Sequence, residues 1–321
     1  MAVYTEISEE QLAEFVAGYD IGDVMSFKGI AEGVENSNYL LVTDRGPFIL
    51  TLYEKRVDEA DLPFFLGLMN HLSARDEQCP TAIADRAGNV KGRLAGRPAA
   101  IITFLNGVWI RRPRREHCLA VGEALAKLHL AAAEFPLKRE NALSLAGWEE
   151  LVEATAASAD QVRPGLTKDI TEEITFLKQS WPRDLPSGVI HGDLFPDNVF
   201  FLGGELSGLI DFYFACNDML AYDLAICLNA WCFEPDGSFN ITKGKALISG
   251  YHSVRPLRAD ELQGLPLLAR GAAFRFLLTR LNDWQNVPEG ALVVPKNPSE
   301  YHAKLRFHRN AHDASAYGFM L

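Results

Sequence analysis

This 321-residue chain has few cysteines, and they do not pair in the sequence. Neither a disulfide framework nor a zinc site is indicated, because the cysteines are odd in number, scattered and without C-x-x-C spacing. We interpret the thiols as reduced and buried, which is the usual state in a cytoplasmic protein. The five cysteines are Cys79, Cys118, Cys216, Cys227 and Cys232.

Positive charge and long hydrophobic runs are also scarce. The 31 Lys and Arg residues are outnumbered by 42 Asp and Glu residues, which gives a formal net charge of −11. Nucleic-acid binding needs a basic surface, so we expect no nucleic-acid partner. No segment approaches the roughly 20 apolar residues of a membrane span. Glu6, Glu9 and Glu10 lie where a signal peptide needs basic and apolar residues. We therefore expect a cytoplasmic protein without a membrane partner, and the sequence does not indicate its oligomeric state.

Two common phosphate-binding patterns are absent from the chain. It contains neither the P-loop pattern G-x-x-x-x-G-K-[ST] nor the glycine-rich pattern G-x-G-x-x-G of protein kinases. Proteins of the P-loop class are therefore excluded. Any nucleotide would need a different arrangement of backbone and side chains around its phosphates.

The order of predicted elements favours an α+β protein with two lobes. A capping-box pattern at 8–11 predicts a short helix near the start, and hydrophobic periodicity predicts another over 58–75. Strand-like runs occur at 24–30, 37–43 and 48–53, with two or three more within 80–107. Later helices are predicted at 116–133, 146–157, 168–180, 240–252, 259–282 and 298–310. We expect a small antiparallel-sheet lobe at 1–105 and a larger, mostly helical lobe at 106–321, joined by the FLNG segment at 104–107.

A cluster of polar residues lies between two apolar runs in VIHGDLFPDNVFF, residues 189–201. Asp193 is suited to act as a base, and Asn198 offers an amide oxygen five residues later. Thirteen residues further on, Asp211 ends the run LSGLI. A hairpin over Gly203 and Gly204 would return Asp211 to the first loop. Carboxylate and amide oxygens suit Mg²⁺, and together with a base they fit phosphoryl transfer.

HGDLFPDN followed by LIDF resembles the catalytic loop and metal-binding segment of the aminoglycoside phosphotransferase and choline kinase group, relatives of the protein kinases. The resemblance implies a two-lobed protein-kinase-like fold and the use of ATP with Mg²⁺. It assigns Asp193 as the catalytic base and Asn198 and Asp211 as metal ligands. His191 would belong to the catalytic loop and hold it by hydrogen bonding.

The same resemblance implies a nucleotide site in the smaller lobe and the connector. The turn EGVENSNYLL, residues 32–41, is similar to the Gly/Asn/Ser turn that approaches the phosphates in this group. An ordinary hairpin turn has the same composition, so the turn alone is weak evidence. The residues assigned to nucleotide binding are Gly33, Asn36, Ser37, Asn38, Phe104 and Asn106.

One position departs from the pattern of the group. FILTLYEKR has Thr51 where relatives usually carry the lysine that pairs with the α- and β-phosphates. Lys55 shares a strand face with Thr51 but lies about 13 Å further along, and Arg56 is the other cation nearby. The partner glutamate of that lysine is equally undecided between Glu54 and Glu59.

The acceptor is indicated by overall pattern alone. From about residue 24 to 309 the chain looks most like bacterial homoserine kinases of the phosphotransferase-like type, which implies L-homoserine as acceptor. Asp218 and Asp223 are candidates for its ammonium group, although Asp223 is more simply a residue that ties its helix to the catalytic loop. Candidates for its carboxylate are Arg275, Arg280 and Arg306.

Other readings use the same residues. An aminoglycoside or choline kinase would share this catalytic core. Thr51 is the feature that favours a pseudokinase, which binds nucleotide without transfer, but the intact set of Asp193, Asn198 and Asp211 argues against it. A two-metal hydrolase is disfavoured because no second carboxylate cluster completes its site.

Overall fold

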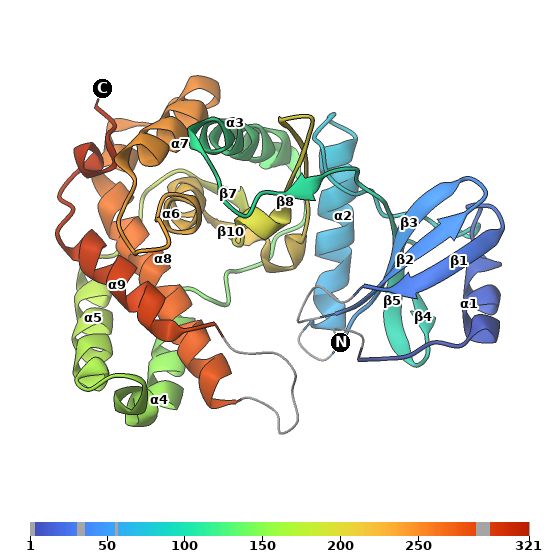
Figure 1. Cartoon of the computed structure of the whole chain (residues 1–321), viewed down its shortest axis with the longest axis horizontal. Coiled ribbons are helices and arrows are strands. Elements are labelled where there is room, and N and C mark those ends of the chain that lie inside the picture. The colour runs from blue at the N-terminus through green and yellow to red at the C-terminus, as the bar shows by residue number, and fades with distance from the viewer. Residues whose placement is uncertain (1–3, 31–35, 55–56, 287–295, 321) are drawn as a thin grey trace.

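The computed structural model describes residues 4–30, 36–54, 57–286 and 296–320. It confirms an α+β protein with a small, sheet-containing N-terminal lobe and a larger helical lobe (Figure 1). The chain leaves the N-terminal sheet after its last strand and passes through residues 104–107 into the helical lobe.

The N-terminal lobe is built on a five-stranded antiparallel sheet in the order β1-β2-β3-β5-β4. Side chains of alternate residues point to opposite faces, so Leu41, Leu50 and Ile101 pack against helix α1 on one side. The opposite face, with Ala100 and Ile102, packs into the core that contains α2. The elements are α1 (Glu9–Val16), β1 (Val24–Gly29), β2 (Ser37–Thr43), β3 (Gly46–Leu52), the short helix η1 (Glu59–Asp61), α2 (Leu62–Ser73), β4 (Gly92–Leu94) and β5 (Arg97–Thr103).

The helical lobe surrounds the buried helix α6, whose residues are inaccessible on almost every side. Glycines let two of its neighbours approach closely. A Cβ at Gly122 of α3 would lie 2.1 Å from the carbonyl oxygen of Leu247, and one at Gly250 of α7 2.2 Å from that of Leu119. The helices are α3 (Arg115–Ala131), α4 (Leu145–Val162), α5 (Leu166–Ser180), α6 (Leu220–Trp231), α7 (Ile241–Val254), α8 (Ala259–Gln285) and α9 (Pro298–Arg309).

Two small sheets carry the polar loops at the centre of the molecule. β7 (Ser187–Ile190) pairs with β10 (Cys216–Met219), and β8 (Val199–Leu202) pairs with β9 (Glu205–Leu209) and with β6 (Val108–Trp109). The hairpin predicted over Gly203 and Gly204 is confirmed. β6 and β10 were not predicted, because neither segment has a strand-like pattern of its own.

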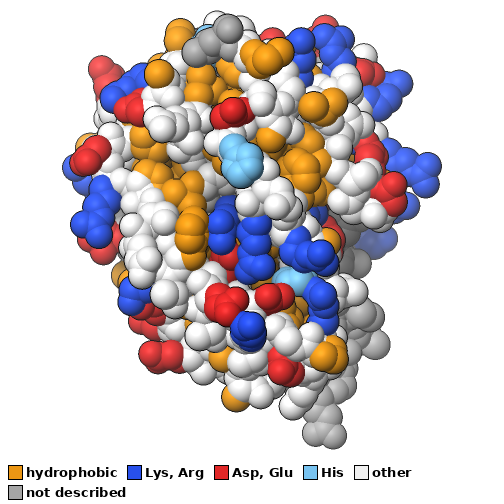
Figure 2. Space-filling view, turned by 90° about the vertical axis from the view of Figure 1, so that its left-hand side faces the viewer, with side chains coloured by type: hydrophobic (Ala, Val, Ile, Leu, Met, Phe, Trp, Pro, Cys, Tyr) orange, Lys and Arg blue, Asp and Glu red, His pale blue; other side chains and the backbone are white. Residues whose placement is uncertain are grey.

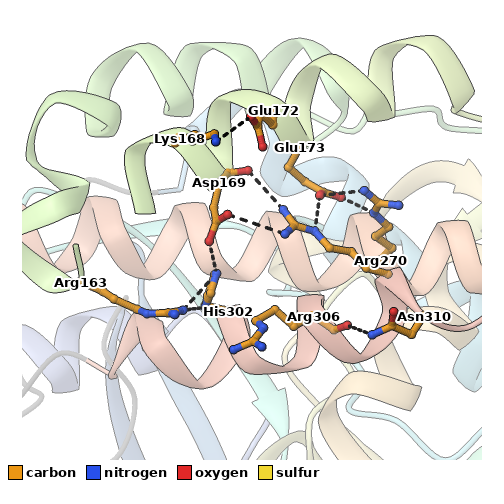
Figure 3. Close-up of polar contacts among 10 residues, drawn as sticks. Arg163, Lys168, Asp169, Glu172, Glu173, Arg270, His302, Arg306 and Asn310 are labelled. Atoms are coloured by element: carbon orange, nitrogen blue, oxygen red, sulfur yellow. Dashed lines mark hydrogen bonds and ion pairs between the residues drawn. The ribbon is translucent and has the colours of Figure 1, made fainter. Parts of the chain in front are cut away.

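A network of charges joins α5, α8 and α9 on the face of the helical lobe that lies far from the sheet (Figures 2 and 3). The buried Glu173 carboxylate accepts hydrogen bonds from Arg270 on α8 and, at 2.8 Å, from Arg309 on α9. His302 of α9 contacts Asp169 of α5 at 2.7 Å. These paired charges fix the position of α8, which also borders the catalytic loop.

Within the described residues, no helix is long and apolar enough to cross a membrane. All five cysteines are buried and free.

Candidate active site

The predicted catalytic loop follows β7, and hydrogen bonds of the His191 ring hold it in place. This side chain is fully buried, and burial lowers its pKa, so the ring is neutral. Nε2 lies 3.0 Å from the carbonyl oxygen of Ile210, and Nδ1 accepts from the backbone N–H of Asp193 at 3.3 Å. The ring therefore connects the backbone at Asp193 with the residue that precedes Asp211. This position supports the loop-holding role.

Asp223 of α6 lies under the same loop. Its two oxygens accept hydrogen bonds from the backbone N–H groups of His191, at 2.6 Å, and Gly192, at 3.0 Å. His129 Nε2 is a third neighbour at 3.1 Å. Burial alone would raise the pKa of Asp223, but these contacts outweigh it and the pKa is lowered. Both Asp223 oxygens are already used by these contacts, so the geometry favours the tethering role over contact with a substrate.

The loop can take this shape because residue 192 is glycine. Gly192 has a φ of 75°, and a Cβ there would meet the carbonyl oxygen of Phe214 at 2.8 Å. Its own carbonyl oxygen accepts a hydrogen bond of 2.6 Å from Arg275 Nη1 of α8. The backbone next to Asp193 is thus held by Asp223 of α6 and by Arg275 of α8.

Asp193, Asn198 and Asp211 are brought together as the sequence predicts. Asn198 Nδ2 donates to the backbone carbonyl of Asp193 at 2.8 Å and lies 3.4 Å from its carboxylate. The carbonyl oxygen of Asn198 accepts from Ile210 N–H at 3.0 Å, which places Asp211 beside the loop. Asp211 itself adopts the left-handed conformation, with φ 66° and ψ 65°, which is uncommon for a residue other than glycine and typical of functional sites.

The donor set at this point fits Mg²⁺. The amide nitrogen of Asn198 is used within the loop, so its oxygen is the atom to offer a cation alongside the Asp211 carboxylate. The described residues include no cluster of three or more His, Cys, Asp or Glu side chains able to hold a metal. Few protein ligands, completed by phosphate oxygens and water, are the usual environment of Mg²⁺ in kinases.

Of the turn assigned to the phosphates, the structure describes Asn36, Ser37 and Asn38. The Ser37 hydroxyl accepts from the backbone N–H groups of Tyr4 and Thr5 and donates to Glu54 at 2.7 Å. The amide oxygens of Asn36 and Asn38 accept from Glu54 N–H and from Thr51 Oγ1. The Ser37 hydroxyl and the two amide oxygens are therefore engaged within the lobe. Gly33, Lys55 and Arg56 lie outside the described residues.

Neither candidate partner glutamate faces the catalytic loop. Glu54 pairs with Arg97 at 3.1 Å, and Glu59 pairs with Lys91 at 2.9 Å and Arg93 at 2.6 Å. The contact between α2 and the helical lobe is made differently. Asp61, which precedes α2, forms an ion pair of 2.6 Å with Arg139, and Arg139 also donates to the carbonyl oxygen of Ala215.

A tyrosine pair joins the lobes beside Asp211 and was missed in the sequence. The hydroxyls of Tyr53, which follows β3, and Tyr213 lie 3.2 Å apart. The Tyr213 ring also packs edge-on against Phe65 of α2. Burial raises the pKa of Tyr213 to about 12, so both groups are neutral donors at physiological pH. The available signal was Tyr213 in IDFY, where protein kinases carry the glycine of D-F-G.

Comparison with known proteins agrees with this geometry. A sequence profile described as the phosphotransferase enzyme family matches residues 26–257. The chain belongs to this family. It is 62% identical over 321 residues, the full length of both chains, to proteins named homoserine kinase from Chelativorans sp. (strain BNC1) and Rhizobium etli.

Solved structures show the fold of this phosphotransferase. An amicoumacin kinase in complex with AMP-PNP, Ca²⁺ and its ligand aligns with a TM-score of 0.68 at 15% identity, covering 94% of this chain and 92% of that one. A spectinomycin phosphotransferase in complex with ADP and spectinomycin gives 0.68 at 12% identity, covering 98% of each chain. The protein-kinase-like fold is thereby confirmed.

In this phosphotransferase, the remaining predicted residues lie at the connector and on β10. Phe104 is partly exposed, and the carbonyl oxygen of Asn106 accepts a hydrogen bond of 2.8 Å from Ser207. The Asp218 carboxylate accepts from Asn141 at 2.6 Å and from Met219 N–H at 2.7 Å. Burial raises the pKa of Asp218.

The three arginines considered for a substrate carboxylate are in different surroundings. Arg280 pairs with Glu300 at 2.6 Å. Arg306 is exposed on α9, beside the charge network of Figure 3. Arg275 is buried under the catalytic loop.

Proposed function

We propose that this phosphotransferase is a homoserine kinase, which transfers the γ-phosphoryl group of ATP to the hydroxyl of L-homoserine in threonine biosynthesis in the cytoplasm. Two observations support this function. Full-length relatives at 62% identity carry that name, and the hairpin β8–β9 brings Asp211 to the loop that carries Asp193 and Asn198. The geometry of the hairpin supports phosphoryl transfer, and the names of the relatives support L-homoserine as the acceptor.

In the proposed mechanism, Asp193 orients the acceptor hydroxyl and accepts its proton as the oxygen attacks the γ-phosphorus and ADP leaves. His191 and Asp223 keep the backbone at Asp193 in place. Asn198 and Asp211 would hold Mg²⁺, which when bound neutralises charge on the β- and γ-phosphates. The turn that contains Gly33, Asn36, Ser37 and Asn38 would then act through its backbone, with Phe104 and Asn106 bordering the nucleotide.

Acceptor recognition needs partners for both charges of the amino acid. Asp218 is the proposed partner of its ammonium group, since this carboxylate lies at the end of the strand that follows the metal-binding segment. An aminoglycoside or choline kinase would place different groups here, so the acceptor distinguishes these functions.

The test is ADP release with Mg-ATP across L-homoserine, L-serine, L-threonine, choline and kanamycin. We expect strong turnover on L-homoserine alone. Turnover on another acceptor alone would retain the catalytic loop and reject homoserine. Binding of Mg-ATP without turnover on any acceptor would favour the pseudokinase, for which the neutral residue Thr51 is the supporting observation.

A further inference from the structure

Arg275 is a buried cation next to the proposed base. It lies on α8 with only 3% of its surface exposed. Nη1 donates to the carbonyl oxygen of Gly192, the residue before Asp193. Its guanidinium also lies over the ring of Phe276 at 4.5 Å and that of Phe214 at 5.6 Å. Water is largely excluded from this charge, so a counter-ion would be bound strongly.

No carboxylate neutralises Arg275 by an ion pair within the part of the chain that the structure describes. Three other arginines of α8 and α9 are paired, Arg270 and Arg309 with Glu173 and Arg280 with Glu300. Arg275 instead leaves its Nε buried without a hydrogen-bond partner among the described residues. Buried polar atoms are almost always satisfied, so an unsatisfied nitrogen on a buried cation calls for a ligand.

One buried hydroxyl near Arg275 also lacks a partner. Tyr301 has an Oη without a hydrogen-bond partner among the described residues, and its ring lies 5.2 Å from that of Phe276, over which the Arg275 guanidinium packs. The charges of Arg275 and Asp193 both act on this phenol. A cationic nitrogen and a hydroxyl donor are thus gathered on the α8 side of the proposed base. Such a donor set fits a carboxylate.

We propose that Arg275, assisted by the hydroxyl of Tyr301, binds the carboxylate of the amino-acid acceptor and so sets its hydroxyl at Asp193. This assignment rests on the proposed function. L-Homoserine supplies the missing counter-ion, while an amino alcohol without a carboxylate leaves the guanidinium buried and unpaired. A site built to pair a substrate group rejects an analogue that lacks it far more strongly than an apolar pocket does.

The experiment compares L-homoserine with 2-amino-1,4-butanediol, in which a hydroxymethyl group replaces the carboxylate. For Arg275→Lys we expect kcat/KM on L-homoserine to fall about 100-fold, mainly through KM, because lysine loses the planar two-point contact. The same substitution weakens the contact with Gly192, so turnover on the diol and acceptor-independent ATP hydrolysis should also fall, but by about 10-fold less than kcat/KM on L-homoserine. Arg306→Lys is the matched control, since this exposed arginine lies on α9 beside the charge network of Figure 3, and both acceptors should behave as with the unsubstituted protein.

Tyr301→Phe gives a second measurement that does not depend on the stability of the Arg275 variant. Its hydroxyl makes no hydrogen bond in the described structure, so its removal should leave folding intact. We expect a several-fold increase in KM for L-homoserine and an unchanged KM for the diol.

Equal losses on both acceptors and in ATP hydrolysis for Arg275→Lys, with no effect of Tyr301→Phe, would overturn the proposal and leave Arg275 as a support of the catalytic loop. Failure of the unsubstituted protein to phosphorylate L-homoserine would overturn the proposed function itself, and this second inference with it. Assaying the unsubstituted protein on L-homoserine distinguishes these two failures.

Discussion

Thr51 Oγ1 donates a hydrogen bond of 2.8 Å to Asn38 Oδ1 across the paired strands β2 and β3. Thr51 is 1% exposed, and the sequence resemblance aligns it with a lysine of related kinases. A neutral contact between a hydroxyl and an amide therefore lies where the resemblance to related kinases implies a cation. The hydroxyls of Tyr53 and Tyr213, 3.2 Å apart, form a second neutral polar contact beside Asp211.

The first prediction concerns the stability of this contact. Thr51→Val keeps the shape of the side chain but leaves the Asn38 oxygen without its donor, which should lower the free energy of unfolding by about 1–3 kcal/mol. Thr51→Ser keeps the hydroxyl and should lose less. Urea unfolding of the two variants measures the difference. Equal stabilities of Thr51→Val and the unsubstituted protein would show that the hydrogen bond contributes nothing.

The second prediction concerns the tether beneath the catalytic loop. Asp223→Asn retains one acceptor oxygen and turns an NH₂ group toward the N–H groups of His191 and Gly192. Breaking such a buried charged contact should lower the free energy of unfolding by about 3–5 kcal/mol. Because the loop backbone shifts, kcat should fall more than the affinity for ATP.

Asp197→Asn is the matched control for that variant, since Asp197 is exposed in the same loop. We expect its stability and kcat to stay near those of the unsubstituted protein. A stable, active Asp223→Asn variant would contradict the tethering role.

Helix α6 was not among the predicted ranges, because it is buried on almost every side and lacks a one-sided apolar pattern. Local patterns were sufficient to predict the other helices and the hairpin β8–β9, because hydrophobic periodicity and the Gly203-Gly204 turn are encoded nearby. They were insufficient for β10, whose four residues become a strand only by pairing with β7, as Asp218 does with Gly188. The motif residues of the catalytic loop were likewise predictable, since their spacing is short.

Side-chain direction was less predictable from the sequence. Ser37 and Asn38 looked like donors for phosphate, but Ser37 lies on the core side of β2 and its hydroxyl is used by Tyr4, Thr5 and Glu54. The Tyr53–Tyr213 contact joins residues 160 positions apart. Such contacts depend on the packing of the two lobes, which no local pattern reports.

The third prediction tests the proposed base. Asp193→Asn removes the proton acceptor and keeps a group of the same size, so kcat should fall by about 10² to 10⁴. Binding of Mg-ATP, measured by calorimetry, should change only a few-fold because Asn198 and Asp211 remain. Asp197→Asn again provides the control of equal charge change. Retained turnover of Asp193→Asn would remove Asp193 from the mechanism.

The fourth prediction concerns the pH dependence of stability. His308 is fully buried, with Nδ1 2.9 Å from the hydroxyl of Tyr317 and Nε2 3.1 Å from Asn229 Oδ1. Burial, with the nearby charge of Lys304, lowers the pKa of His308 from 6.5 to about 3. Between these values the unfolded chain binds a proton that the folded protein does not. As the pH is lowered from 6.5 toward 3, the free energy of unfolding should therefore decrease, by up to about 1.4 kcal/mol per pH unit from this group.

His308→Gln removes that ionisation and should make the decline from pH 6.5 toward pH 4 shallower, although the variant is less stable at pH 8 because a packed ring is lost. His312→Gln, at an exposed position, is the control and should keep the slope of the unsubstituted protein. Urea unfolding at half-unit pH steps measures the slopes. Parallel curves for His308→Gln and the unsubstituted protein would show that this buried ring does not titrate on unfolding. The acid sensitivity would then have to come from other buried histidines such as His117, His191 and His302, whose pKa values are also lowered by burial.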